Sequence, residues 1–159
     1  MSTPHYRILF VCLGNICRSP AAEILCRAQL RKVGLASRVQ VDSCGTASYH
    51  IGSKPDSRMI AALRRAGYEY DGHRARTLRP ADGSEFHLII PQDKANLRDV
   101  RAMLSPTAPA EVAPMSRWFP EDTRYTEVPD PYYGSDADFD EVVRLLSQAT
   151  QNLIHSLKL

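Results

Sequence analysis

The first strand and the first helix of the chain can be predicted directly from its sequence. Residues 7–11, RILFV, form a short continuous apolar run, which is typical of a parallel strand buried on both faces. The residues from Ser19 to Gly34 then predict a helix, with Ser19 as the N-cap, Pro20 as the first helical residue and Gly34 at the end. The chain therefore begins as a strand, a loop and a helix.

The same alternation continues along the chain. Further strands are predicted at 38–45 and 86–90, and further helices at 55–68 and 93–104. Strands that alternate with helices predict an α/β fold, in which a parallel sheet is covered by helices on both faces.

The last third of the chain is less regular. Six prolines lie between residues 105 and 131, so this segment should be mostly irregular, with a short fourth strand near 111–115. From Ser135 onward, apolar residues recur at helical spacing and predict a final helix. Ligands of parallel sheets bind beyond the carboxyl ends of the strands. Residues 12–19 lie at such an end.

Length and composition indicate one globular domain. The 159 residues, 43% of them hydrophobic and 24% charged, suit a single domain over residues 1–159. The net charge of +2 gives no reason to expect nucleic acid as a partner. No apolar run approaches the roughly 18 residues of a membrane helix, so we expect no membrane insertion. The four cysteines all lie in the first third of the chain, a poor layout for stabilising disulfides. We therefore expect a cytoplasmic protein.

The loop between the first strand and the first helix has the composition of an anion site. It reads VCLGNICRSP at 11–20, and a loop that runs from a strand end into a helix N-terminus turns successive backbone N–H groups inward. Gly14 permits unusual dihedrals and close backbone approach, and Asn15 tolerates the left-handed conformation. Arg18 would add a planar guanidinium that suits phosphate.

Cys12 stands at the floor of this predicted cradle, where the helix dipole and Arg18 both favour a thiolate. A thiolate in contact with a bound phosphate is a nucleophile in line with phosphorus, and Ser19 could donate its hydroxyl to the sulfur. Chance alone makes the spacing C-x5-R unremarkable in such an arginine-rich chain, and buried free cysteines are common. The residues alone leave two alternatives, a catalytic thiolate or a buried cysteine beside a solvated arginine.

Together these residues resemble the signature of the low-molecular-weight protein tyrosine phosphatases. The similarity continues in order along the chain, through DSCGT at 42–46, GHRAR at 72–76, DKANLRDV at 93–100 and DPYYG at 130–134. It implies a four-stranded parallel sheet and a phosphatase without metal or cofactor that acts through a phosphocysteine intermediate. Its substrates would be phosphotyrosine-containing proteins and small aryl phosphates, and we expect a monomer.

The resemblance also implies a role for each site residue. Cys12 would be the nucleophile, Arg18 would bind phosphate, and Asp130 would act first as general acid and then as the base that activates water. Phosphate binding and loop support would fall to Leu13, Gly14, Asn15, Ile16, Cys17, Ser19, Ser43 and His73. The substrate cleft would be lined by Tyr49, Tyr132 and Tyr133. From the residues alone, an ordinary proline-rich turn around Asp130 and a surface position for Tyr49 are the alternatives.

Cys17 lies in the same loop as Cys12. The resemblance implies that the two can form a disulfide under oxidation, which would shield Cys12 from irreversible over-oxidation; packing of Cys17 against the sheet is the alternative.

Three other functions use related chemistry. An arsenate reductase of similar fold would need further cysteines downstream, and none follows Cys44. A protein-arginine phosphatase has a similar signature with threonine in place of Ile16. A non-catalytic phosphate-binding module would need neither Cys12 nor Asp130.

Overall fold

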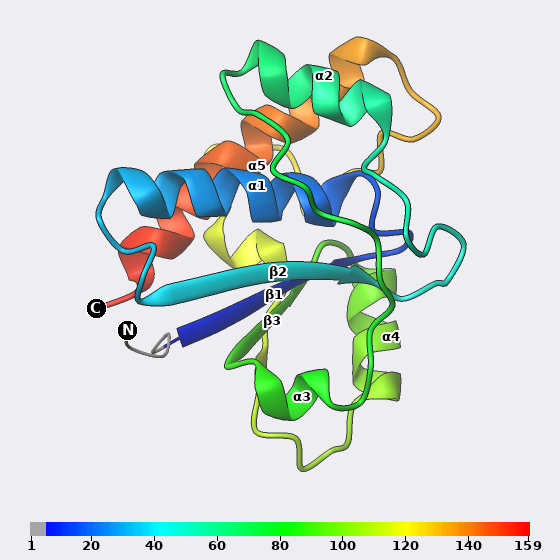
Figure 1. Ribbon diagram of the computed structural model, residues 1–159, viewed down its shortest axis with the longest axis vertical. Helices are drawn as coiled ribbons and strands as arrows, with labels where there is room; N and C mark the ends of the chain where they lie inside the picture. Colours follow the sequence, from blue (N-terminus) through cyan, green and yellow to red (C-terminus); the bar gives the residue numbers. More distant parts are fainter. Residues whose placement is uncertain (1–5) are drawn as a thin grey trace.

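The computed structural model describes residues 6–159 (Figure 1). Its strands form one parallel four-stranded sheet in the order β2-β1-β3-β4. The strands are β1 (Tyr6–Cys12), β2 (Val39–Gly45), β3 (Leu88–Pro91) and β4 (Glu111–Val112). The helices are α1 (Arg18–Lys32), α2 (Ser57–Arg65), α3 (Asp82–Glu85), α4 (Lys94–Met103) and α5 (Asp136–Ser156), with a 3-10 helix η1 (Met115–Trp118). The predicted fold class is confirmed.

Helices cover both faces of the sheet (Figure 1). α1 and α5 pack together on one face, and α2 packs on α5. The larger core lies on this side and includes Ile8 and Phe10 of β1 and Phe139 of α5. α3 and α4 lie on the other side, where Leu9 and Val11 of β1 join a second buried cluster. Successive side chains of a strand point to opposite faces, which explains why β1 is apolar and buried on both faces from Ile8 to Cys12.

The predicted strands and helices are present, with shifted ends. The helix predicted at 55–68 is shorter because Asp56 caps α2, accepting a hydrogen bond from the Arg58 N–H at 2.8 Å. α3 and η1 were not predicted, since each spans four residues, too few for a periodic pattern. Of the helices in residues 6–159, none combines the length and the apolar character that a bilayer crossing requires.

The start of α1 differs from the prediction. α1 begins at Arg18, two residues earlier than expected, and its N-cap is Cys17, which makes no side-chain cap hydrogen bond. The prediction of Ser19 as the N-cap is therefore wrong. Because the loop itself supplies the cap position, Ser19 falls within the first turn, where it is fully buried and its Oγ faces Cys12.

Candidate active site

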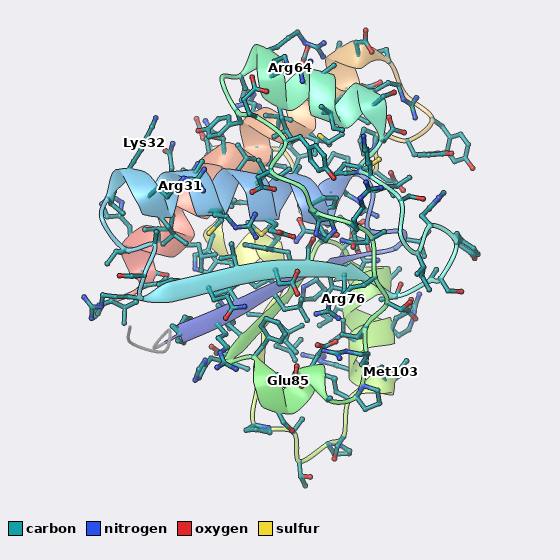
Figure 2. The ribbon with its side chains drawn as sticks, viewed as in Figure 1. Arg31, Lys32, Arg64, Arg76, Glu85 and Met103 are labelled. Atoms are coloured by element: carbon teal, nitrogen blue, oxygen red, sulfur yellow. The ribbon has the colours of Figure 1, made fainter. Side chains whose placement is uncertain are left out.

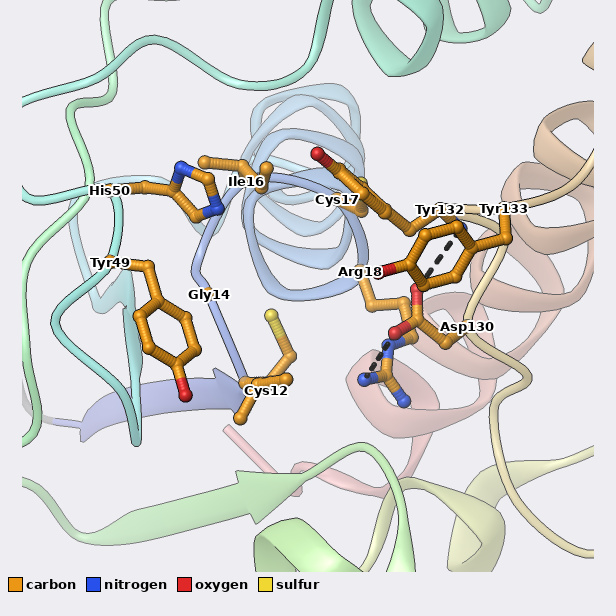
Figure 3. Close-up of a pocket in the computed structure, with 11 residues that line it drawn as sticks. Cys12, Gly14, Ile16, Cys17, Arg18, Tyr49, His50, Asp130, Tyr132 and Tyr133 are labelled. Carbon is orange, nitrogen blue, oxygen red and sulfur yellow. Dashed lines mark hydrogen bonds and ion pairs between the residues drawn. The ribbon is translucent and has the colours of Figure 1, made fainter.

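A pocket of about 350 Å³ lies beyond the carboxyl end of β1 (Figure 3). It brings together the loop 13–17 and two segments that are remote in sequence. The residues that line it are Cys12, Leu13, Gly14, Ile16, Cys17, Arg18, Tyr49, His50, Asp130, Tyr132 and Tyr133. All of them except His50 belong to the predicted site, so the structure gathers the predicted nucleophile, arginine, acid and tyrosines around one cavity.

The loop 13–17 has backbone N–H groups without protein partners. Within the part of the chain that the structure describes, none of these five groups donates to a protein acceptor. Asn15 has the predicted left-handed conformation, with φ 58°. Gly14 does not; its missing side chain matters because a Cβ there would lie 3.0 Å from Cδ2 of His50. Unpaired N–H donors beside a helix N-terminus form an anion-binding arrangement.

Cys12 is the last residue of β1, directly before this loop, and its side chain is buried. Its Sγ lies 3.0 Å from Ser19 Oγ. The amide Nδ2 of Asn15 donates to the same Oγ at 2.8 Å, so the hydroxyl hydrogen of Ser19 is left for Sγ or for the Cys44 carbonyl, 3.3 Å away. The arrangement therefore offers a thiolate a hydroxyl donor in addition to the N-terminus of α1.

Arg18 is held by partners on elements far from α1. Only 3% of the residue is exposed, and its Nη1 donates to Asp93 Oδ2 at 2.6 Å and to the Val128 carbonyl at 3.1 Å. Burial alone would lower the pKa of Arg18, but negative charge at Cys12, Asp93 and Asp130 outweighs burial and raises the pKa. The guanidinium is therefore a fixed positive charge in the pocket wall.

The side chain of Asn15 is the centre of a buried hydrogen-bond network. Its Nδ2 donates to Ser19 Oγ and, at 3.0 Å, to Ser43 Oγ. Its Oδ1 accepts from His73 Nε2 at 2.8 Å and from the Arg76 N–H at 3.0 Å. All four bonding positions of the amide are used. Ser43 and His73, both predicted supports, thus lie against the loop and fix the conformation of Asn15.

Glu23 of α1 extends this network and was not predicted. Its Oε1 accepts from Ser43 Oγ at 2.6 Å and lies 3.0 Å from His73 Nδ1. Both ring nitrogens of His73 therefore face oxygen atoms of this network. Burial alone would raise the pKa of Glu23, but His73 and Arg27 outweigh burial, so this pKa lies below the ordinary glutamate value. The sequence did hold one sign of a buried role for Glu23, because it is the only charged residue in the apolar stretch AAEILC.

Glu23, Asp42 and His73 also bring ligand atoms within 4.8 Å of one another, close enough to hold a metal ion. The carboxylates of this group are already engaged: Glu23 pairs with Arg27 and His73, and Asp42 pairs at 3.1 Å with Arg76, labelled near the end of β2 in Figure 2. These contacts favour an ion-pair network that supports the loop.

We expect Glu23→Gln to destabilise the protein at neutral pH by about 1–3 kcal/mol, the range for a disrupted buried polar contact. Because the folded-state pKa of Glu23 is lowered, its ionised form stabilises the fold above the unfolded value of about 4.3. That contribution is lost as the pH falls through the folded pKa. Melting temperatures of wild type and variant, measured by circular dichroism, should converge in acid. Glu121→Gln, at an exposed loop position, is the control, and a Glu23→Gln difference independent of pH would contradict the expectation.

Tyrosines and Asp130 form the rim of the pocket. Tyr49, 76% exposed, and Tyr133, 95% exposed, stand on opposite sides of the mouth (Figure 3). Tyr132 meets Tyr133 edge to face, with ring centroids 5.0 Å apart. Asp130 Oδ2 lies 3.6 Å from Arg18 Nη2, and its Oδ1 accepts from the Tyr132 N–H at 3.1 Å. The carboxyl group is thus between the guanidinium and the aromatic rim.

His50 is the pocket residue that sequence reasoning missed. Its ring approaches Gly14 and lies edge-on to Tyr49, with centroids 6.3 Å apart. It belongs to a turn that is fixed by a remote segment, because the Gly52 N–H donates to the Ala75 carbonyl at 2.8 Å. No local pattern carries that information.

Cys17 is buried in the wall of the same pocket. Burial, reinforced by the negative charge of Asp56, raises the pKa of the Cys17 thiol far above its ordinary value. Cys17 is therefore a neutral thiol, and all four cysteines of the chain are free.

Residues 7–159 match the family model of the low molecular weight phosphotyrosine protein phosphatases. The chain belongs to this family. The low molecular weight protein-tyrosine-phosphatase YfkJ of Bacillus subtilis is 36% identical over 95% of this chain and 95% of its own length. A low molecular weight phosphotyrosine protein phosphatase of Schizosaccharomyces pombe is 36% identical over 98% of this chain and 99% of its own. The crystal structure of an Entamoeba histolytica protein tyrosine phosphatase, with Hepes in its active site, matches with a TM-score of 0.91 and 36% identity, covering 96% of this chain and 97% of that one.

Membership of the low molecular weight phosphatase family confirms the main functional expectation. The chain is a cysteine-dependent protein tyrosine phosphatase rather than an arsenate reductase, an arginine phosphatase or a passive phosphate-binding module. Phosphoproteins are the substrates that this family membership implies.

Proposed function

We propose that this phosphatase hydrolyses phosphotyrosine in proteins, and small aryl phosphates, with Cys12 as its nucleophile. The observation that carries the proposal is that Cys12 shares one pocket with Arg18 and with a loop whose backbone N–H groups have no protein partner. A phosphate dianion can accept hydrogen bonds from several of those N–H groups and a forked pair from the guanidinium. This places the charge that binds the substrate next to the sulfur that attacks it.

The proposed reaction has two steps. The Cys12 thiolate attacks phosphorus and the tyrosyl oxygen leaves, forming the phosphocysteine. Because the pKa of tyrosine is about 10, its oxygen is a mediocre leaving group and needs a proton, which Asp130 donates. The resulting Asp130 carboxylate then takes a proton from water, which attacks the phosphocysteine. Inorganic phosphate leaves, and the Cys12 thiolate is restored with the Ser19 hydroxyl as its donor.

The guanidinium of Arg18 and the backbone N–H donors of the loop stabilise the transition state in this scheme. Arg18, held by Asp93, and the N–H groups of Leu13, Gly14, Asn15, Ile16 and Cys17 face the charge that grows on the phosphoryl oxygens. Ser43 and His73 act indirectly, by holding Asn15 in its left-handed conformation. We propose that neither a metal ion nor a cofactor takes part.

Tyr49, Tyr132 and Tyr133 form the binding cleft for the aromatic ring of the substrate in this proposal. Their position at the pocket mouth supports it, since aromatic rings favour offset or edge-to-face contact with another ring. An aryl ester would bury its ring between these side chains, while a short alkyl ester would leave them uncovered.

We also propose a protective role for Cys17. Peroxide would oxidise the Cys12 thiolate to a sulfenic acid, and the Cys17 thiol would condense with it, forming a disulfide and releasing water. The shared pocket wall of the two cysteines supports this role.

Cytoplasmic location and a monomeric state complete the proposal. A reducing compartment would keep all four free cysteines as thiols.

Hydrolysis by the wild-type protein tests the function. We expect release of phosphate from a phosphotyrosyl peptide and from an aryl phosphate, undiminished by a metal chelator. We expect far slower release from the matched phosphoseryl and phosphoarginyl peptides. Acid quenching during turnover should trap one phosphoryl group on the peptide that contains Cys12. Preference for phosphoarginine, loss of activity in chelator, or a phosphoryl group trapped elsewhere would each contradict the proposal.

A further inference from the structure

Arg58, in the first turn of α2, contacts both the core and the rim of the active site. Its guanidinium carbon lies 4.6 Å from the ring centroid of Phe139 and 5.4 Å from that of Tyr132. Both distances are in the range of a cation–π contact. Phe139 is fully buried in α5, so its ring is a rigid support for the guanidinium. Tyr132, by contrast, belongs to the proposed substrate cleft.

The other side of the guanidinium is fixed to Asp56. Arg58 Nε donates to Asp56 Oδ1 at 3.0 Å, and Nη2 donates to Oδ2 at 2.9 Å. This is a bidentate pair, the most directional form of ion pair. The Asp56 backbone N–H in turn donates to the Ile16 carbonyl at 2.8 Å. Arg58 is thereby connected, through one residue, to the phosphate-binding loop.

Tyr132 is also connected to the proposed acid. Its backbone N–H donates to Asp130 Oδ1 at 3.1 Å, a local turn that sets the direction of the carboxyl group. The contacts therefore run without a break from the Ile16 carbonyl through Asp56, Arg58 and Tyr132 to Asp130. They join two segments that are separated by more than 70 residues along the chain.

The placement of Arg58 is unfavourable as a local feature. A cation in the first turn of a helix opposes the helix dipole, which favours negative charge at that end. α2 has no acidic residue in its first turn, so Asp56 at the N-cap is the nearby charge that compensates. This indicates that the contacts with Tyr132 and Phe139, rather than helix formation, account for arginine at this position.

We propose that Arg58 is a positioning residue, which holds Tyr132 and Asp130 at a fixed distance from the phosphate-binding loop and so favours aryl esters. The proposal rests on the function proposed above. Arg58 does not line the pocket that holds Cys12; in this proposal it acts through Tyr132. Its removal should leave the cradle intact and loosen the rim.

Arg58→Met tests this role, because methionine keeps the aliphatic bulk and removes the guanidinium. We expect KM for a phosphotyrosyl peptide to rise about 5- to 10-fold, and kcat to depend more steeply on the leaving group as Asp130 loses its position. The rate of Cys12 alkylation by iodoacetate and the affinity of the cradle for inorganic phosphate, neither of which needs Asp130, should stay within about 2-fold of wild type. Arg58→Lys keeps the charge without the planar fork and should give an intermediate KM. Arg64→Met is the matched control: Arg64 lies at the outer surface of α2 (Figure 2), with 63% of its side chain exposed.

Backbone relaxation by NMR gives a readout that does not depend on catalysis. Order parameters at Tyr132 and Tyr133 should fall in Arg58→Met and stay unchanged in Arg64→Met. Unchanged order parameters and kinetics, or equal losses for leaving phenols of every pKa, would overturn the positioning role while the wild-type activity still stood. A wild-type protein without phosphatase activity would instead overturn the proposed function.

Discussion

Replacement of Cys12 by serine is expected to lower turnover of an aryl phosphate by about 10⁴-fold or more, the scale on which loss of an essential nucleophile acts. A serine hydroxyl at this position is a poor nucleophile, because a hydroxyl is far less acidic than a thiol and stays protonated at neutral pH. Ser19, the nearest side chain, is itself a hydroxyl, and Arg18 is a permanent cation. The oxygen is also smaller than sulfur, which increases the distance to phosphorus.

Binding of the anion should survive this change. The cradle is made of backbone N–H groups and Arg18, none of which the serine removes. The measurement is turnover by wild type and Cys12→Ser side by side with a chelator present, together with phosphate affinity by calorimetry. Cys26→Ala, at a buried position of α1 outside the pocket, is the control and should stay close to wild type. Activity that survives in the serine variant would assign the chemistry to another group.

Asp130→Asn is expected to give the second largest loss, about 10²- to 10⁴-fold for a poor leaving group such as tyrosine. Asparagine has the same shape and can still accept the Tyr132 N–H, so the segment 130–133 should keep its conformation. What it loses is the acid proton for the phenolate and the base for water. For aryl phosphates whose phenols are strongly acidic, departure needs little protonation, and the loss in phosphocysteine formation should be much smaller.

The decisive quantity is therefore the dependence of the rate on the leaving group. Rates of phosphocysteine formation across a series of aryl phosphates should fall steeply with the pKa of the leaving phenol in Asp130→Asn and only gently in wild type. Asp122→Asn, at an exposed loop position away from the pocket, should follow the wild-type line. Equal losses for every phenol would remove Asp130 from the role of acid.

The sequence was most informative where structure is local. β1, the loop and α1 follow one another directly, so the apolar run and the residue types of the loop were enough to predict a strand, an anion cradle and a helix in the right order. The role of Cys12 as nucleophile came from the family resemblance. Asn15 was expected to tolerate the left-handed conformation because of its residue type, and its φ of 58° shows that it adopts that conformation. The capping prediction for Ser19 was wrong because the same residue type that caps a helix can also face a buried sulfur, and only the loop conformation decides between the two.

The remainder depends on contacts between segments that are distant in the chain. Glu23 could be recognised as unusual within an apolar helix face, but its partner His73 is 50 residues away, and no local pattern pairs them. Arg18 and Asp93 meet only because β1 and β3 are adjacent in the sheet. His50 lines the pocket and Arg58 contacts Tyr132 at its rim, through a turn and a cation–π contact that tertiary packing brings together. Glu23, His50 and Arg58 are the residues that could not be found from the sequence alone.

The position of β1 has a consequence for the motions of the enzyme. β1 is paired on both sides, with β2 and β3, and is buried on both faces, so its amides should exchange with solvent only when the whole molecule unfolds. Cys12 is the last residue of that strand. Fluctuations of the native protein will therefore open and close the exposed rim while the nucleophile stays in place. Cys12, at the floor of the pocket, should therefore leave its position only when the whole protein unfolds cooperatively.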